Sequence, residues 1–303
     1  MTKCYHVIFI NVQFCYNQVN NRNRGVKLMD NNFFPIVSGA LGGIISNSFK
    51  GPIKTVEEWW YITFGHTISE KAEKLRIQQQ INVEKFKHEI LNEIQTIGPE
   101  NIQEPKAKII GPALEASKYY LDEDDLRQMF AKLIASSLDK DKNPNMHSSF
   151  TEIIKQLDPI DAENLAIIYR EKQCVTCNIK ETVIPIGGFI TLFDNVFIDN
   201  PNQTDVNVQS ASITNLQRLG LIYITFEEFR HDANSYKKFY DSIPYKMATS
   251  IIDQNNFDNQ KNKQYNPELY SKLGIEKYDG PEIQKGLVKM TPYGNHFCEI
   301  CLK

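Results

Sequence analysis

The sequence predicts a mainly helical protein with a small β component: a helical N-terminal domain followed by a winged-helix-like C-terminal domain. Up to residue 157, apolar residues recur at the three- and four-residue spacing of amphipathic helices. After Lys172 the pattern changes to short runs of β-branched and aromatic residues, which are typical of strands. The length of 303 residues favours two domains. We therefore expect a leader at residues 1–28 and domains at residues 29–157 and 158–303.

The composition excludes two broad classes of protein. The chain has 34 basic and 37 acidic residues, so it is not a basic protein that coats nucleic acid. Its mean hydropathy is −0.41, and no apolar run approaches the length of a membrane-spanning helix. These properties are typical of a globular protein in the cytoplasm. The six cysteines are then expected to be reduced thiols.

The leader has four basic residues and no acidic one. Its apolar stretch at residues 7–10 is interrupted by Asn11 and Gln13, and no small-residue cleavage site follows. This pattern does not fit a secretory signal. It predicts a loosely ordered leader, or translated upstream sequence with the natural start at Met29.

Two unusual segments follow the leader. Phe33–Ser46 is apolar and rich in small residues, and its length suits a buried or interfacial segment better than a bilayer span. The aromatic cluster Trp59–Phe64 is typical of core or helix–helix packing. Self-association through this cluster is an alternative, as is membrane contact by both segments.

Five helices are predicted between residues 83 and 169. The apolar stripe that begins at Val83 ends at Gly98-Pro99, and Pro112 is expected to open the next helix. The widest stripe predicts a helix from Asp124 to Leu138. A short helix follows, with Ser149 and Glu152 spaced as a capping box, and Asp158-Pro159 begins another through Tyr169.

The C-terminal half has the element order of a winged helix. A strand or hairpin at Thr182–Phe193 precedes a helix at Val208–Leu219, a strand at Leu221–Phe226, a strand at Gly286–Met290 and a terminal helix through Cys301. A polar insertion separates the last two strands, at about residues 227–281. Its segment Asp253–Pro267 is nearly all Asn, Gln, Asp and Lys and is expected to be a mobile loop.

In winged-helix proteins the helix corresponding to Val208–Leu219 often enters the major groove of DNA. The candidate DNA contacts are Gln209, Asn215, Gln217 and Arg218. Binding to DNA requires neutralisation of phosphates, and this helix offers one cation. A protein-contacting or structural role is therefore favoured, and DNA binding stays an alternative.

Several ordered motifs are similar to those of a known family. They include Glu100–Pro105, Ile110–Ala116, Leu126–Ser137, His147 with Phe150, Leu219–Ile222 and Met290–Gly294. Together they resemble the Abi-alpha family, bacterial proteins assigned to abortive infection against bacteriophage. The chain has His147-Ser148-Ser149-Phe150 where that family tends to have His-Pro-Ser-Phe. The resemblance implies a role in phage defence and supplies no established active site.

The sequence offers no strong catalytic or metal-binding motif. It has no Walker loop, no nucleophile elbow and no dinucleotide fingerprint, so no cofactor is predicted. Two Cys-x-x-Cys pairs form a weak candidate for a four-thiolate zinc site: Cys174, Cys177, Cys298 and Cys301.

Arg127 and His147 are the polar motif residues whose role is open. An arginine beside an apolar stripe most often pairs with a nearby acid such as Glu123 or Asp124, and a histidine before a helix most often caps or packs. The sequence thus predicts a non-enzymatic abortive-infection protein that acts through a protein partner or self-association. A DNA-binding regulator of a defence locus and a membrane-active toxin are the alternatives.

Overall fold

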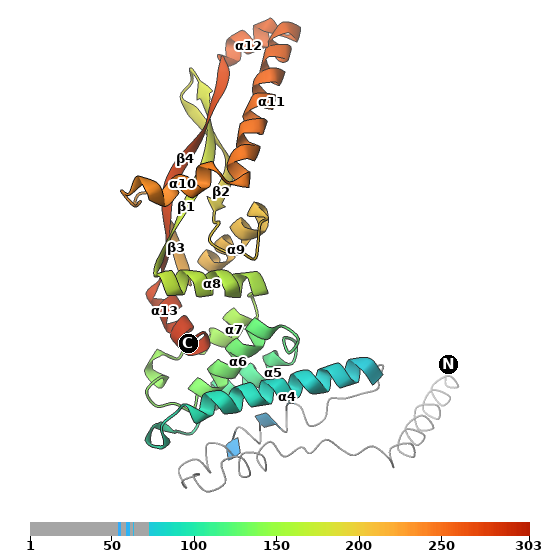
Figure 1. Ribbon diagram of the computed structural model, residues 1–303, viewed down its shortest axis with the longest axis vertical. Coiled ribbons are helices and arrows are strands. Elements are labelled where there is room, and N and C mark those ends of the chain that lie inside the picture. Colours follow the sequence, from blue (N-terminus) through green and yellow to red (C-terminus); the bar gives the residue numbers. More distant parts are fainter. Residues whose placement is uncertain (1–53, 56–58, 61–62, 64–72) are drawn as a thin grey trace, which may run out of the picture.

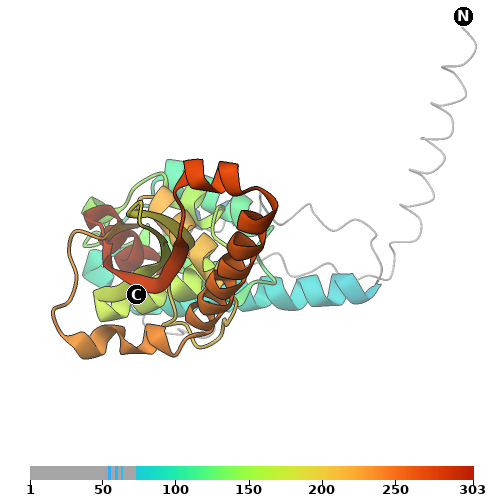
Figure 2. The same cartoon turned by 90° about the horizontal axis from the view of Figure 1, so that it is seen from above.

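The computed structural model describes residues 54–55, 59–60, 63 and 73–303. The predicted leader, the segment Phe33–Ser46 and most of the aromatic cluster lie outside these residues. Figure 1 shows a group of helices at one end, from which a long twisted sheet extends, and Figure 2 shows the sheet end on with a long helix beside it. We call helices α4–α8 and α13 the base. We call the sheet together with α11 and α12 the arm. The expectation of a mainly helical protein with a β component is confirmed.

The base is built around one central helix. The helix α6 (Asp124–Ser136) packs against α4 (Glu73–Gln95), α5 (Ala107–Ser117), α7 (Phe150–Ile154), α8 (Pro159–Glu171) and α13 (Pro292–Cys301). Short 3₁₀ turns at Pro99–Asn101 and Asn143–Asn145 lie in the connections. The apolar stripe of α6 is buried against side chains of its neighbours, because a helix with one apolar face must cover it.

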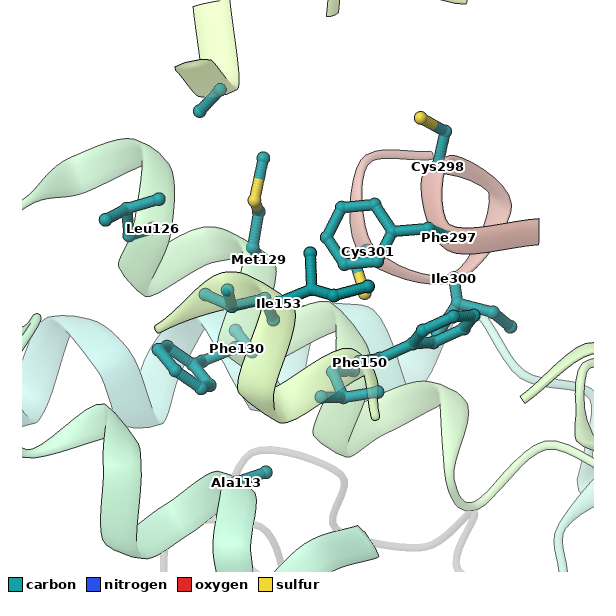
Figure 3. Close-up of a cluster of buried hydrophobic side chains, with 14 of the residues drawn as sticks. Ala113, Leu126, Met129, Phe130, Phe150, Ile153, Phe297, Cys298, Ile300 and Cys301 are labelled. Carbon is teal, nitrogen blue, oxygen red and sulfur yellow. The ribbon is translucent and has the colours of Figure 1, made fainter. Parts of the chain in front are cut away.

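The last helix of the chain completes the core of the first half. Figure 3 shows Phe297, Ile300 and Cys301 of α13 close to Phe150 of α7 and Met129 of α6. The rings of Phe150 and Phe297 meet edge to face, with centroids 5.3 Å apart. The core therefore crosses the predicted boundary at residue 157, which stays a prediction.

Two helix starts in the base differ from expectation. Pro112 lies inside α5 rather than at its first turn. The helix begins at Ala107 because Ile109 and Ile110, which precede the proline, are buried in the core. The side chain of Ser149 does not cap α7 and instead bonds to neighbouring side chains described below. At α8 the expected start is confirmed, and the Asp158 amide donates to the Asp161 carboxylate at 3.0 Å.

The arm is a four-stranded antiparallel sheet in the order β2-β1-β4-β3. Its strands are β1 (Gln173–Ile184), β2 (Gly188–Val196), β3 (Ile222–Thr225) and β4 (Lys277–Met290). The predicted hairpin, the two later strands and the terminal helix are confirmed. The helix α9 (Val206–Arg218) packs against α8, β2 and β3, where the sheet meets the base. A winged helix stays a prediction.

A second, smaller apolar cluster lies on one face of the sheet. Val175, Cys177 and Ile179 alternate along β1 and point to the same side. They pack with Tyr236 of the 3₁₀ turn Ala233–Tyr236, and with Phe239 of the short helix α10 (Lys237–Tyr240). This cluster stabilises the lower part of the sheet, next to the base.

The prediction of a mobile loop at Asp253–Pro267 is wrong. This sequence forms most of α11 (Ile243–Tyr265) and the start of α12 (Pro267–Leu273). Asn256 and Asn259 lie on the face of α11 that contacts β4 and the residue before it. The Asn256 amide donates to the Tyr278 carbonyl and its oxygen accepts from the Tyr278 amide, both at 2.8 Å. Asn259 and Lys263 donate to the Glu276 carbonyl at 3.1 and 2.8 Å. Hydrogen bonds to the strand thus replace the apolar stripe that most helices need.

Candidate functional site

Arg127 is the most deeply buried charged residue of the family motif, with 1% of its surface exposed. Its Nε and Nη2 atoms donate to the two oxygens of Glu89 at 3.0 and 2.8 Å, and its Nη1 donates to the Leu121 carbonyl at 2.9 Å. Nη2 also lies 2.6 Å from Asp124 Oδ1. The predicted pairing with Asp124 is confirmed, and Glu89 is a partner that the sequence did not reveal. Arg127 thus joins α6 to α4.

The electrostatics of this cluster favour the charged states of Arg127 and Asp124. Burial alone would lower the pKa of the Arg127 guanidinium, but the hydrogen bonds that it donates to Glu89 and Asp124 raise it. The hydrogen bond from Arg127 and a second from Lys85 lower the pKa of Asp124. A bidentate pair of this kind fixes the orientation of both side chains. The arrangement is suited to holding two helices together rather than to proton transfer.

His147 lies in a chain of polar groups formed by two separate motifs. Its Nδ1 is 2.6 Å from Ser149 Oγ and accepts from the Ser149 amide at 3.2 Å. Ser149 Oγ also contacts the hydroxyl of Tyr293, from α13. The His147 ring packs edge to face on the Tyr293 ring, with centroids 5.7 Å apart. Because Nδ1 accepts, the neutral ring carries its proton on Nε2.

This chain connects the loop before α7 to the terminal helix. A serine beside a histidine is also the pairing of a nucleophile and a base, but catalysis needs a third group that orients the histidine. The described hydrogen bonds give His147 no carboxylate partner, and its side chain is exposed. The geometry supports a connecting role for His147, Ser149 and Tyr293.

The four cysteines that were a weak candidate for a zinc site do not lie together. Within the part of the chain that the structure describes, no group of three or more His, Cys, Asp or Glu side chains is arranged to hold a metal ion. The reason is the geometry of β1: Cys174 and Cys177 are three residues apart on a strand, so their side chains point to opposite faces. Cys174 joins the core of the base, whereas Cys177 joins the cluster on the other side of the sheet.

All four cysteines act as small apolar core residues. Burial raises the pKa of the Cys174 and Cys177 thiols to about 12. The same cause raises the pKa of Cys298 and of the fully enclosed Cys301. The thiolate form that binds metals or attacks substrates is therefore disfavoured at neutral pH.

The candidate DNA contacts on α9 are mostly used inside the protein. Gln209 is buried, and its amide donates to the Asn200 and Gln203 carbonyls at 3.3 and 3.0 Å. Asn215 donates to Asp161 at 2.7 Å and accepts from Arg218, whose Nη1 also donates to Gln156. Gln217 is exposed. The structure therefore brings Asn215 and Arg218 together at the end of α7 and places Gln209 apart from them.

Two neighbouring cavities lie where the base meets the sheet. One has a volume of about 380 Å³ and lies between α6, α8 and the segment 199–202. The other has a volume of about 350 Å³ and lies between α8, the start of β1 and α10. Ile167, Arg170 and Asp199 line both.

The charged groups at these cavities largely pair with one another. Lys238 pairs with Asp199, and Arg170 pairs with Glu171. Neither cavity is lined by Arg127, His147 or Ser149. Arg127, His147 and Ser149 therefore lie apart from both cavities, whereas Gln128, Met129 and Lys132 of the same motif line the 380 Å³ cavity.

The comparison with protein families resolves the assignment that the motifs suggested. A family model described as abortive infection alpha matches residues 78–301. This range runs from α4 to α13 and includes the Arg127 cluster and the chain of His147, Ser149 and Tyr293. The chain belongs to the abortive infection alpha family. Comparisons with curated proteins and with solved structures gave no match.

The family match covers both the base and the arm. The long β1–β2 hairpin and α11 therefore lie within the matched region. No helix among the described residues has both the length and the apolarity needed to cross a bilayer. The polar helix α11, with 23 residues, is long enough but lacks the apolarity.

Proposed function

We propose that this protein is a cytoplasmic component of phage defence in bacteria, which halts or kills the infected cell through contacts with proteins. The observation that carries the proposal is the abortive infection alpha match over residues 78–301. The geometry adds support, because Arg127, His147 and Ser149 hold helices together and line neither cavity.

The winged-helix interpretation of residues 158–303 forms part of this proposal. It is supported by the order α9, β3, β4 and α13, and by the antiparallel pairing of β4 with both β1 and β3. The internal hydrogen bonds of Gln209, Asn215 and Arg218 favour a structural or protein-contacting use of α9 over groove binding. In this reading α9 joins the sheet to the base.

A plating assay tests the proposed function. Cells that express the protein are challenged with a broad panel of phages, and the efficiency of plating and the survival of infected cells are measured. We expect reduced plating of at least one phage together with poor survival of the infected cells. Unchanged plating across the whole panel would contradict the proposal.

A matched pair of variants ties that assay to the motif. Tyr293→Phe removes the hydroxyl that contacts Ser149 and keeps the packing of the ring against Phe150. Tyr119→Phe makes the same chemical change on a base residue that is 75% exposed. We expect Tyr293→Phe to weaken protection and Tyr119→Phe to leave it unchanged. A dye that enters leaky cells is followed in parallel, since early leakage would favour a membrane-active toxin over protein contacts.

A further inference from the structure

The tip of the β1–β2 hairpin is the most apolar exposed part of the described surface that the proposed function leaves unused. Ile186, Phe189 and Ile190 are 59%, 61% and 46% exposed, and they lie within five consecutive residues. A Cβ atom added at Gly187 or Gly188 would meet no atom within 4 Å, so no described segment covers this turn. Clusters of exposed apolar residues usually mark an interaction surface.

The same tip carries a free strand edge. β2 pairs only with β1 in the described sheet, so its other edge is open to a further strand. Side chains of neighbouring elements bind the last three residues of β2. The Ser210 hydroxyl of α9 donates to the Asp194 carbonyl, and the Thr176 hydroxyl of β1 donates to the Val196 carbonyl. Residues 188–192 receive no such hydrogen bond among the described contacts, although β2 also contacts α11 and Leu192 packs against the second apolar cluster. An open, apolar edge strand is a template for pairing with another chain.

The absence of charged side chains on the hairpin indicates which partner this strand edge binds. From Thr182 to Phe193 the hairpin carries no charged side chain, because the nearest charges in sequence are Glu181 and Asp194. Glu181 is buried, and Asn255 donates to both of its carboxylate oxygens. Antiparallel pairing of two copies about Ile190 would therefore place no like charges opposite one another.

We propose that this edge is a self-association surface, on which residues 188–192 of β2 pair antiparallel with the same residues of a second copy of this chain. Pairing about a two-fold axis makes each partner contact the same patch. Phe189 then lies opposite Thr191 and Ile190 lies opposite its own copy. Lys180 lies 3.6 Å from the centre of the Phe189 ring and keeps that ring upright beside the edge. The surface lies far from the aromatic cluster at Trp59, for which self-association was an alternative. The two described tryptophans of that cluster offer little exposed aromatic surface, because Trp60 is buried and Trp59 packs against Gly111.

The mass of the purified full chain in solution tests this inference without any phage. Sedimentation equilibrium is measured for the wild type and for Phe189→Lys, Ile190→Lys and the control Tyr119→Lys. We expect the wild type to form a dimer of twice the 35.0 kDa chain mass. Both hairpin variants are expected to weaken dimerisation at least tenfold, because Ile190→Lys places two like charges opposite one another and Phe189→Lys replaces an apolar side chain of the paired edge with a charge. The control is 75% exposed in the base and should dimerise like the wild type.

Two results would overturn the inference: a wild-type chain that stays monomeric at high concentration, or a dimer that the hairpin variants leave unchanged. Circular dichroism melts of all four proteins establish that the variants are folded. Hydrogen exchange adds a readout specific to strand pairing. We expect amides at residues 188–192 to exchange more slowly as the protein concentration rises in the wild type, and independently of concentration in Ile190→Lys. Concentration-independent exchange in the wild type would also contradict the inference.

Discussion

Helix α6 in the base and helix α11 in the arm are both well-formed helices, yet they are held in place differently. α6 buries nine of its 13 residues, and most of those nine are apolar. α11 buries four of its 23 residues and meets the strand β4 through asparagine side chains. Burial of apolar surface is the main source of folding free energy, whereas a hydrogen bond that replaces one to water adds only about 0.5–1.5 kcal/mol. We therefore expect the arm to open more readily than the base.

The largest expected effect comes from the core of the base. Phe130 is completely buried on α6, so Phe130→Ala removes apolar contacts and leaves a cavity. We expect the free energy of unfolding to fall by about 3–5 kcal/mol in urea denaturation. Tyr119→Ala, at an exposed position of the base, is the control and should change the value by less than about 0.5 kcal/mol. A loss below about 1 kcal/mol in Phe130→Ala would show that the base is not the main source of stability.

The joint between base and arm is the second target. At Gly294, in the Thr-Pro-Tyr-Gly motif, a Cβ atom would lie 1.9 Å from the Leu221 carbonyl oxygen, so the backbone must move. We expect Gly294→Ala to cost about 1–3 kcal/mol or more, the usual range for overpacking. Gly188→Ala is the matched control, since its Cβ would meet nothing within 4 Å. Equal stability of the two variants would contradict the close approach of α13 to Leu221.

The polar contacts of the arm give the third prediction. Asn255 donates to both oxygens of the buried Glu181, at 3.2 and 3.0 Å. Asn255→Ala leaves that carboxylate without this partner, at a cost of about 1–3 kcal/mol. We expect faster hydrogen exchange in α11 and β1 with unchanged exchange in α6. Asn262→Ala, on the exposed side of α11, should leave both unchanged. If Asn255→Ala accelerates exchange in α6 equally, the arm and the base unfold together.

The smallest effect is a dependence on pH in the base. The hydrogen bonds of Asp124 to Arg127 and Lys85 lower its pKa below the ordinary value of about 3.9. Its contribution to stability is therefore complete above that value and is lost as the pH falls through the lower pKa of the folded state. We expect Asp124→Asn to be less stable than the wild type at pH 7, with a difference that shrinks below about pH 4. A difference that grows on acidification would contradict the assigned pairing.

The sequence predicted the base well because its helices are amphipathic. The stripes of α4 and α6 were readable from apolar spacing, and the break after α4 was readable from Gly98-Pro99. The long helix α11 was not readable, because its contacts with β4 use asparagine amides and backbone groups. An Asn-rich segment has the composition of a loop. Here it forms a helix beside β4, and its asparagine amides donate to backbone carbonyls of the neighbouring chain segment.

The candidate site shows the same limit. Arg127 could be matched to Asp124, which lies one turn away, but Glu89 lies on another helix and has no local signal. Tyr293 meets Ser149 from 144 residues away. The zinc hypothesis failed because the spacing of Cys174 and Cys177 brings two thiols together on a helix but separates them on a strand. Each of these outcomes depended on the tertiary structure or on the type of element.

Native-state hydrogen exchange tests the difference between base and arm most directly. The free energy of opening is measured for individual amides in a series of low denaturant concentrations. We predict that amides of α6 and α8 exchange only through global unfolding, whereas amides of α11 and of the upper part of β4 exchange through a smaller opening at lower free energy. Equal opening free energies in α6 and α11 would contradict this account, because the molecule would then unfold as one unit.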